Sequence, residues 1–239
     1  EVELWDWCYN IEETTILSPS SSVTNGQVIP PEIGQLINLT QLNLSHKYLV
    51  GEIPSEFWNL TNLEVIELSN NNLTGEIPSE IGNLTNLIYL TFEGNEFTGV
   101  IPSEIGDLIN ITVLVLSNNN LIGEIPLEIG NLTSLERLIL WSNQLTGEIP
   151  SEIVSLPFIN TLYIHNNQLS GLIPEEICNI DYINLDNNKL CPSYPECLSQ
   201  QQLGSQEISD CEETSLCNEE TEVELWDWCY NIEETTILS

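Results

Sequence analysis

A unit of 24 residues recurs through most of this chain and constrains the fold more than any other feature. Residues 63–78 and 111–126 carry nearly the same pattern at twice that spacing. The sixth unit is three residues shorter than the others, so a seventh begins at Ile180, and a degenerate unit spans 16–38. The six clear units begin at Leu39, Leu63, Leu87, Ile111, Leu135 and Ile159. A repeat of this length predicts a solenoid in which each coil packs only on its neighbours.

The residues within one unit predict how each coil runs. In 41–45 apolar and polar residues alternate, which is the period of a half-buried strand, with Leu42 and Leu44 pointing inward. A Leu-Thr-Gly-x-Ile-Pro stretch then turns the chain, because Gly permits unusual backbone angles and Pro blocks a continuing helix. One Asn in each turn is expected to hydrogen-bond buried backbone groups in a ladder: Asn71, Asn95, Asn119, Asn143, Asn167 and Asn188.

The unit L-x-x-L-x-L-S-x-N-x-L-T-G-x-I-P-x-E-I-G-N-L-T-N resembles the plant-type leucine-rich repeat over residues 14–197. Such repeats occur in receptor ectodomains, polygalacturonase-inhibiting proteins and some microbial surface proteins, where a tandem array is one possibility. The resemblance implies an α/β-type repeat solenoid, right-handed and curved, with a parallel sheet on the concave face and mostly strand, coil and 3-10 turns on the convex side. It also implies binding of peptides, proteins or glycans, usually without catalysis. The chain departs from the pattern in its single N-terminal cysteine and its acidity.

A second, longer repeat divides the chain. Residues 1–18 recur without a change at 222–239. We therefore expect an N-terminal cap at 1–18, a solenoid at 16–197, an acidic cysteine-containing linker at 198–221, and the start of a next module at 222–239. An artificial terminal duplication, or an overlap within a repeating polymer, is the alternative. Tryptophans of the cap and its copy are expected to cover the open end of the solenoid and the module junction: Trp5, Trp7, Trp226 and Trp228. Trp5 and Trp7 are two residues apart, so a strand would project both to one side.

The seven cysteines suggest disulfides, because one 221-residue period holds an even six. We expect Cys191 to pair locally with Cys197. Cys229, the copy of Cys8, is expected to pair with Cys211 or Cys217 across the junction. Cys178 then takes whichever cysteine remains, and Cys8 is left for a preceding module. Sequence alone cannot fix this connectivity, and no C-x-x-C pair or accompanying His favours a metal site.

Side chains that point outward from the strands predict a contact patch on the concave face. Its apolar and aromatic members fall in adjacent units, and exposed patches of this kind usually mark contact sites. The alternative is that β-branched and aromatic residues simply suit a sheet. The patch comprises Tyr89, Val113, Val115, Ile139, Trp141 and Tyr163.

Sequons and acidic residues follow the repeat. Asn59, Asn83 and Asn131 are the best placed acceptors for glycans, whereas Asn43 lies on the sheet. The full set of candidates is Asn38, Asn59, Asn72, Asn83, Asn110 and Asn131. Glutamates of the Gly-Glu-Ile-Pro-Ser-Glu stretches form rows down one flank. Calcium could bridge these rows, although no EF-hand loop is present.

Charge excludes several classes of function. With three basic and 37 acidic residues, the net charge is −34, which disfavours nucleic acid and anionic membranes as partners. No apolar run approaches the ~20 residues that span a bilayer. His46 and His165 have no nucleophile at a recognisable spacing, so neither catalysis nor a cofactor is expected. The preferred interpretation is a structural or adhesive protein, extracellular or at the cell surface, that contacts copies of itself end to end in an array or filament. The alternative is a module that recognises a peptide, protein or glycan on its concave sheet.

Overall fold

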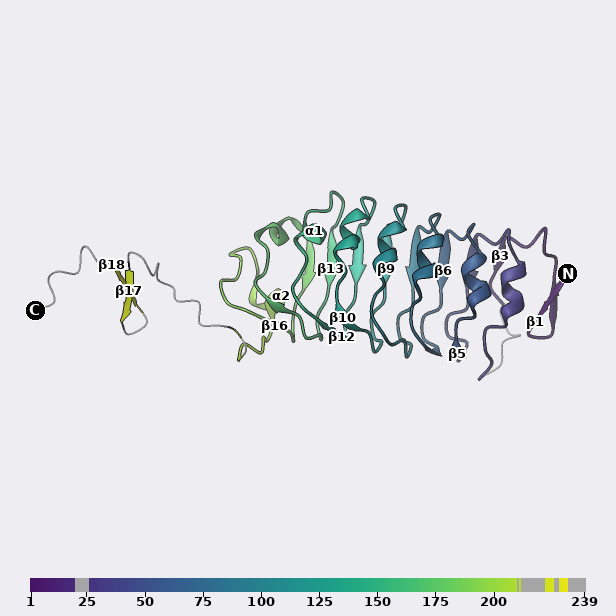
Figure 1. Cartoon of the computed structure of the whole chain (residues 1–239), viewed down its shortest axis with the longest axis horizontal. Helices are drawn as coiled ribbons and strands as arrows, with labels where there is room; N and C mark the ends of the chain where they lie inside the picture. Colours follow the sequence, from purple (N-terminus) through teal and green to yellow (C-terminus); the bar gives the residue numbers. More distant parts are fainter. Residues whose placement is uncertain (20–25, 210, 212–221, 226–227, 232–239) are drawn as a thin grey trace, which may run out of the picture.

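Figure 1 shows a series of coils stacked along one axis, starting from a hairpin at the N-terminus. The computed structural model describes residues 1–19, 26–209 and 211, together with the backbone of 222–225 and 228–231. Within this part, each 24-residue unit forms one coil with a strand, a turn, an extended segment and a short 3-10 helix. The repeat solenoid expected from the sequence is confirmed.

One parallel sheet of eight strands lines the concave face, one strand per coil. Strands three residues long are sufficient here, because every coil repeats the same register with its neighbour: Leu42 lies beside Ile66, and Leu90 beside Leu114. In sheet order the strands are β15 (Tyr182–Asn184), β13 (Thr161–Tyr163), β11 (Arg137–Ile139), β9 (Val113–Val115), β8 (Tyr89–Thr91), β6 (Val65–Glu67), β4 (Gln41–Asn43) and β3 (Ile16–Leu17).

Short strand pairs form a second side of the solenoid, where the Leu-Thr-Gly-x-Ile-Pro stretches lie. At Gly75 the backbone has φ of 87°, and an added Cβ would meet the side chain of Glu52 in the preceding coil. The pairs are β5 (Val50–Glu52) with β7 (Asn72–Thr74), β10 (Ile122–Glu124) with β12 (Gln144–Thr146), and β14 (Ser170–Gly171) with β16 (Lys189–Leu190).

Helical turns occupy the third side. Each begins directly after a proline, whose fixed φ suits entry into a turn. Nearly all are single 3-10 helices, and one is a short α-helix. They are η1 (Pro31–Gln35), η2 (Ser55–Asn59), η3 (Ser79–Asn83), η4 (Ser103–Asp107), η5 (Leu127–Asn131), α1 (Ser151–Val154) and η6 (Glu175–Asn179).

A single hydrophobic core runs the length of the stack. Repeat positions that were expected to point inward are fully buried, including Leu42, Leu68 and Leu114. The asparagine ladder lies along this core. Asn119 shows its chemistry: its Oδ1 accepts from the Phe97 backbone, and its Nδ2 donates to the carbonyls of Phe92 and Leu116. One amide thus satisfies backbone groups of two coils that are closed off from water.

An antiparallel hairpin of β1 (Val2–Leu4) and β2 (Trp7–Tyr9) covers the first coil. Val2 and Leu4 are buried against η1. The prediction that Trp5 and Trp7 project to one side is wrong. Trp5 lies in the hairpin turn with φ of 49° and is buried, whereas Trp7 begins β2 and is 59% exposed. A strand that reverses between the two residues cannot keep their alternation.

The other end of the solenoid is closed by residues that the sequence analysis assigned to a linker. After helix α2 (Gln200–Leu203), Gln206 takes the place of a ladder asparagine: its Oε1 accepts from the Leu190 amide and its Nε2 donates to Leu185. Residues 198–207 therefore form a C-terminal cap, because the last coil has backbone groups that need partners. Residues 212–221 lie outside the described part of the chain.

Two disulfides hold this C-terminal cap. They join Cys178 to Cys197 and Cys191 to Cys211. The expected Cys191–Cys197 pair is wrong, as is Cys211 as a partner of Cys229. The cap wraps back over the last coils, so cysteines about 20 residues apart meet while the nearer pair does not.

Cys8 is exposed and free, and Cys217 and the side chain of Cys229 lie outside the described residues. The copied segment forms a second hairpin from β17 (Glu222–Leu225) and β18 (Trp228–Asn231). Val223 lies opposite Tyr230, as Val2 lies opposite Tyr9. The side chains of Trp226 and Trp228 are not described.

Candidate ligand-binding surface

The outward positions of the concave sheet form straight columns, because neighbouring strands share one register. Val113 lies between Tyr89 and Arg137. In the next column Val115 lies between Thr91 and Ile139, and Ile139 is beside Tyr163. The structure therefore brings five of the six predicted patch residues together through strands β8 to β13, and Trp141 lies two residues after the end of β11.

Burial divides this patch into a floor and a rim. Val115 is 6% exposed and Ile139 is 8% exposed, so these two residues are not open contact positions as predicted. Tyr89, Trp141 and Tyr163 remain partly exposed around them. An apolar floor with aromatic edges suits the binding of an apolar or aromatic group.

A cluster of rings lies at the C-terminal side of the patch. The rings of Trp141 and His165 stack with centroids 5.5 Å apart and planes 9° apart. The Tyr163 ring packs edge-on against His165 at 6.3 Å. The sequence analysis left His165 out of the patch, although it lies 24 residues after Trp141 and so occupies the same outward column. Its place in the column was the signal that could have included it.

Two buried polar atoms beside Trp141 lack hydrogen-bond partners: the Ser117 hydroxyl and Nδ1 of His165. The repeat explains why the Ser117 hydroxyl has no hydrogen-bond partner. The hydroxyl of Ser69, two coils earlier, bonds to Thr91, whereas Ile139 occupies the corresponding position for Ser117. Burial lowers the pKa of His165, and nearby Asp186 opposes that shift. Buried groups without partners are uncommon in proteins, so their place within the patch is notable.

The N-terminal side of the patch is acidic. Burial raises the pKa of Tyr89, and the nearby carboxylates of Glu67 and Glu93 raise it further, against the effect of Arg137. Glu67 is held by Asn43, whose Nδ2 donates to its Oε2 over 2.6 Å. Tyr89 therefore lies between two negative charges, with the only arginine of the chain two strands away.

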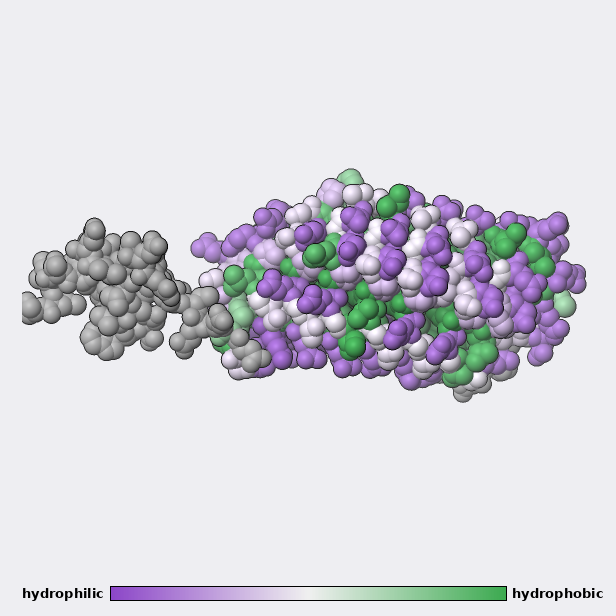
Figure 2. All heavy atoms as spheres, in the orientation of Figure 1, coloured by the Kyte–Doolittle hydropathy of each residue, from purple (hydrophilic) through white to green (hydrophobic). Residues whose placement is uncertain are grey.

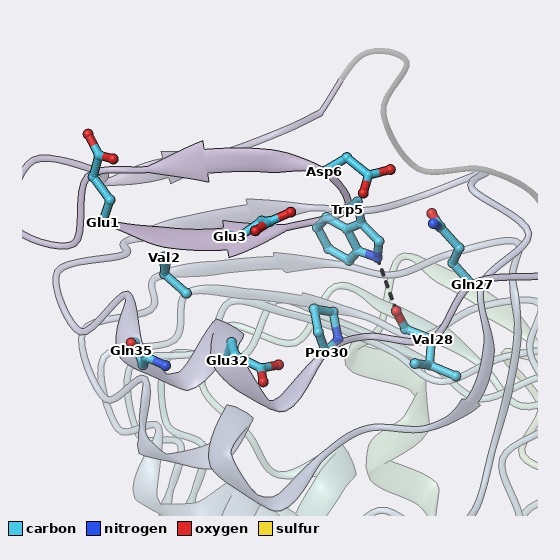
Figure 3. Close-up of a pocket in the computed structure, with 10 residues that line it drawn as sticks. All are labelled: Glu1, Val2, Glu3, Trp5, Asp6, Gln27, Val28, Pro30, Glu32 and Gln35. Atoms are coloured by element: carbon cyan, nitrogen blue, oxygen red, sulfur yellow. Dashed lines mark hydrogen bonds between the residues drawn. The ribbon is translucent and has the colours of Figure 1, made fainter.

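A separate pocket opens at the N-terminal hairpin (Figure 3). The Trp5 indole donates to the Val28 carbonyl over 3.0 Å and forms one wall. Glu1, Glu3 and Asp6 are also among the residues that line the pocket. The tryptophan predicted at the module junction is thus used to attach the hairpin to the first coil.

The sequons differ in how their amides are engaged. Asn59, Asn83 and Asn131 are exposed at the ends of 3-10 helices. The amide of Asn38 donates to Glu12, and that of Asn110 to Thr85. Asn72 is exposed and its amide donates to Glu96 over 3.4 Å. Glycosylation at any of them stays a prediction.

The flank carries much of the acidity. On the face in Figure 2, hydrophilic side chains run in bands along the stack, with hydrophobic groups between them. In the part of the chain that the structure describes, no three His, Cys, Asp or Glu side chains converge as metal ligands would. The described residues also include no helix long and apolar enough to cross a membrane.

Comparison with known proteins relates these surfaces to a family. A model of the leucine-rich repeat matches residues 38–60, 62–84, 86–108, 110–132, 134–156 and 158–180. No curated protein sequence matches the chain.

Among similar solved structures is the ectodomain of the receptor kinase GASSHO1/SCHENGEN3 from Arabidopsis thaliana, in complex with CASPARIAN STRIP INTEGRITY FACTOR 2. Its sequence is 38% identical and its TM-score is 0.68, and the match covers 73% of this chain and 22% of that one. The plant peptide hormone receptor RGFR1 in complex with RGF2 is 35% identical, with a TM-score of 0.69 over 72% and 28%. A plant ice-binding protein is 29% identical, with a TM-score of 0.59 over 74% and 66%. The chain thus spans about a quarter of the two receptor chains. The repeats, the parallel sheet and this similarity to plant receptor ectodomains show that the chain belongs to the leucine-rich repeat family.

Proposed function

We propose that this protein is an extracellular recognition module that binds a peptide or protein segment on its concave sheet. The observation that carries this proposal is the patch itself, with Val115 and Ile139 as its floor and Tyr89, Trp141 and Tyr163 around it. Aromatic side chains beside an apolar floor are typical of binding hot spots.

The similarity to receptor ectodomains supports the same proposal. Two of the similar structures are complexes, one of a plant peptide hormone receptor with RGF2 and one of a receptor kinase ectodomain with CASPARIAN STRIP INTEGRITY FACTOR 2, and these ligands belong to those proteins. The disulfides of the C-terminal cap suit an oxidising extracellular setting. These comparisons favour recognition over the end-to-end array that the sequence analysis preferred, and they give filament assembly no support.

Selection from a display library of random twelve-residue peptides tests this function. We expect the chain to enrich peptides whose affinity falls at least tenfold in Trp141→Ala, because a rim aromatic that closes over an apolar floor commonly contributes more than about 1.4 kcal/mol. Leu127→Ala is the matched control, since Leu127 is 60% exposed on η5, away from the sheet. Peptides that bind both variants as well as the unchanged chain would refute the concave site.

A second proposal, self-association, rests on one observation. The copied hairpin of β17 and β18 repeats the register of β1 and β2. Because Cys211 is paired with Cys191, Cys217 is the remaining candidate partner for Cys229. Peptide mapping without reduction tests the bond, and sedimentation at rising concentration tests association. A Cys217–Cys229 bond with concentration-dependent assembly would support the array, and a monomer at every concentration would contradict it.

A further inference from the structure

The acidic side of the patch places the strongest restriction on the sequence of the peptide proposed for the concave sheet. We propose that the bound segment is basic, and that an ammonium or guanidinium group of this segment lies between Glu67, Tyr89 and Glu93. This inference rests on the proposed function and adds the chemistry of the ligand.

The geometry of the sheet defines this position, which we call the acidic cup. Thr91 forms its floor and is 5% exposed. Glu67 lies beside Thr91 on the neighbouring strand, and Tyr89 and Glu93 lie two residues before and after it. Strand alternation therefore places all four side chains on the same outward face. Thr91 is closed to other partners, because its hydroxyl bonds to Ser69 over 2.7 Å.

The side chains of the cup suit a cation in three ways. Two carboxylates can accept charge-assisted hydrogen bonds, which are stronger than neutral ones. The Tyr89 ring offers a face that attracts a cation. Asn43 already orients Glu67 through the 2.6 Å hydrogen bond, so less freedom is lost on binding.

An independent observation lies in the next coil. Ser117 follows Glu93 in the same outward column, because Phe92 donates to Val115 and Gly94 donates to Ser117. Its side chain is fully buried and its hydroxyl has no partner. A buried hydroxyl without a partner therefore lies in the residue next to one carboxylate of the cup, and such groups are uncommon in proteins.

The distribution of charge on the sheet determines where the basic and apolar residues of the peptide lie. The chain carries 37 acidic and three basic residues, so its surface favours a basic partner in general. Arg137 lies two strands from Tyr89, beyond Val113, and would repel a second cation there. A basic residue is therefore favoured at the cup, and an apolar residue over Val115 and Ile139.

The random twelve-residue library again serves as the probe. The unchanged chain should enrich peptides with Lys or Arg. For an enriched lysine peptide, replacement of lysine by norleucine, which is similar in length but uncharged, should weaken binding at least tenfold. In the E67Q/E93Q variant the lysine peptide should bind at least tenfold more weakly, and the difference between lysine and norleucine should disappear.

The control is E52Q/E76Q, which also removes two negative charges, but from the exposed flank. It should change affinity by less than about twofold at physiological salt, because solvent screens distant charges. An equal loss in both double variants would mean that overall charge attracts the peptide, and would overturn the acidic cup. Enriched peptides without a cation that still require Trp141 would overturn the cup alone and leave the proposed function standing. Peptides that ignore Trp141, Glu67 and Glu93 would contradict both.

Discussion

The inner asparagine ladder and the outward columns of the concave sheet differ in how closely they follow the repeat. In the ladder, Asn95, Asn119 and Asn143 each donate to the coil before and to their own coil in the same way. Along one outward column the residues change from Ser69 to Glu93, Ser117 and Trp141. The repeated positions stabilise the fold, and the positions that depart from the repeat determine the chemistry of the concave surface.

Removal of one ladder amide tests this comparison with the largest effect. Asn119→Ala leaves the Phe97 amide without its partner. The Phe92 and Leu116 carbonyls each lose one donor and keep another, from Asn95 and Asn143. We expect the free energy of unfolding to fall by about 3 kcal/mol, since the unpaired buried amide costs about 1–3 kcal/mol and each of the two other lost hydrogen bonds about 1 kcal/mol. Urea denaturation measures this loss.

The exposed neighbour provides the control for the ladder. Asn120→Ala should change stability by less than about 0.5 kcal/mol, because surface substitutions away from special features have small effects. Equal losses in the two variants would show that the ladder has no special role.

The C-terminal cap tests the same comparison where the repeat ends. Cys191→Ser with Cys211→Ser removes a bond that closes a loop of 20 residues. We expect a loss of about 3 kcal/mol from loop-closure entropy, with early melting of the last coils seen by hydrogen exchange. Mapping that finds Cys191 joined to Cys197 would instead restore the pairing expected from the sequence.

Titration of His165 should give the smallest effect. Burial lowers its folded pKa below the ordinary 6.5, so the unfolded chain binds the proton more readily. The unfolding free energy should therefore fall as the pH drops through about 6.5, and less steeply in His165→Gln. NMR of the imidazole in the folded and urea-unfolded chain measures both pKa values. A folded value above the unfolded one would contradict the stacked, desolvated ring.

Sequence could predict what periodicity determines. The strand at 41–43, the buried Leu42 and the ladder asparagines all follow from the position within the unit. Sequence could not predict that Val115 and Ile139 would be buried, because burial on an outward face depends on how the surrounding side chains pack. It also missed the C-terminal cap, where a glutamine rather than an asparagine ends the ladder.

Departures from the repeat were the hardest to interpret. Trp5 and Trp7 appeared to share a face because a continuous strand was assumed, and the tight turn at Trp5 separates them. The Cys191–Cys197 pair appeared favourable by sequence distance alone. In both cases the path of the chain after the last regular residue decided the outcome.

Hydrogen–deuterium exchange of the chain with and without a selected peptide tests the central claim most directly. If the departures from the repeat form the binding surface, amides at 89–93, 113–117, 137–141 and 161–165 should exchange more slowly when the peptide is bound. The 3-10 helices at 79–83 and 127–131 should not change. Protection confined to those helices, or to the N-terminal hairpin, would contradict the claim.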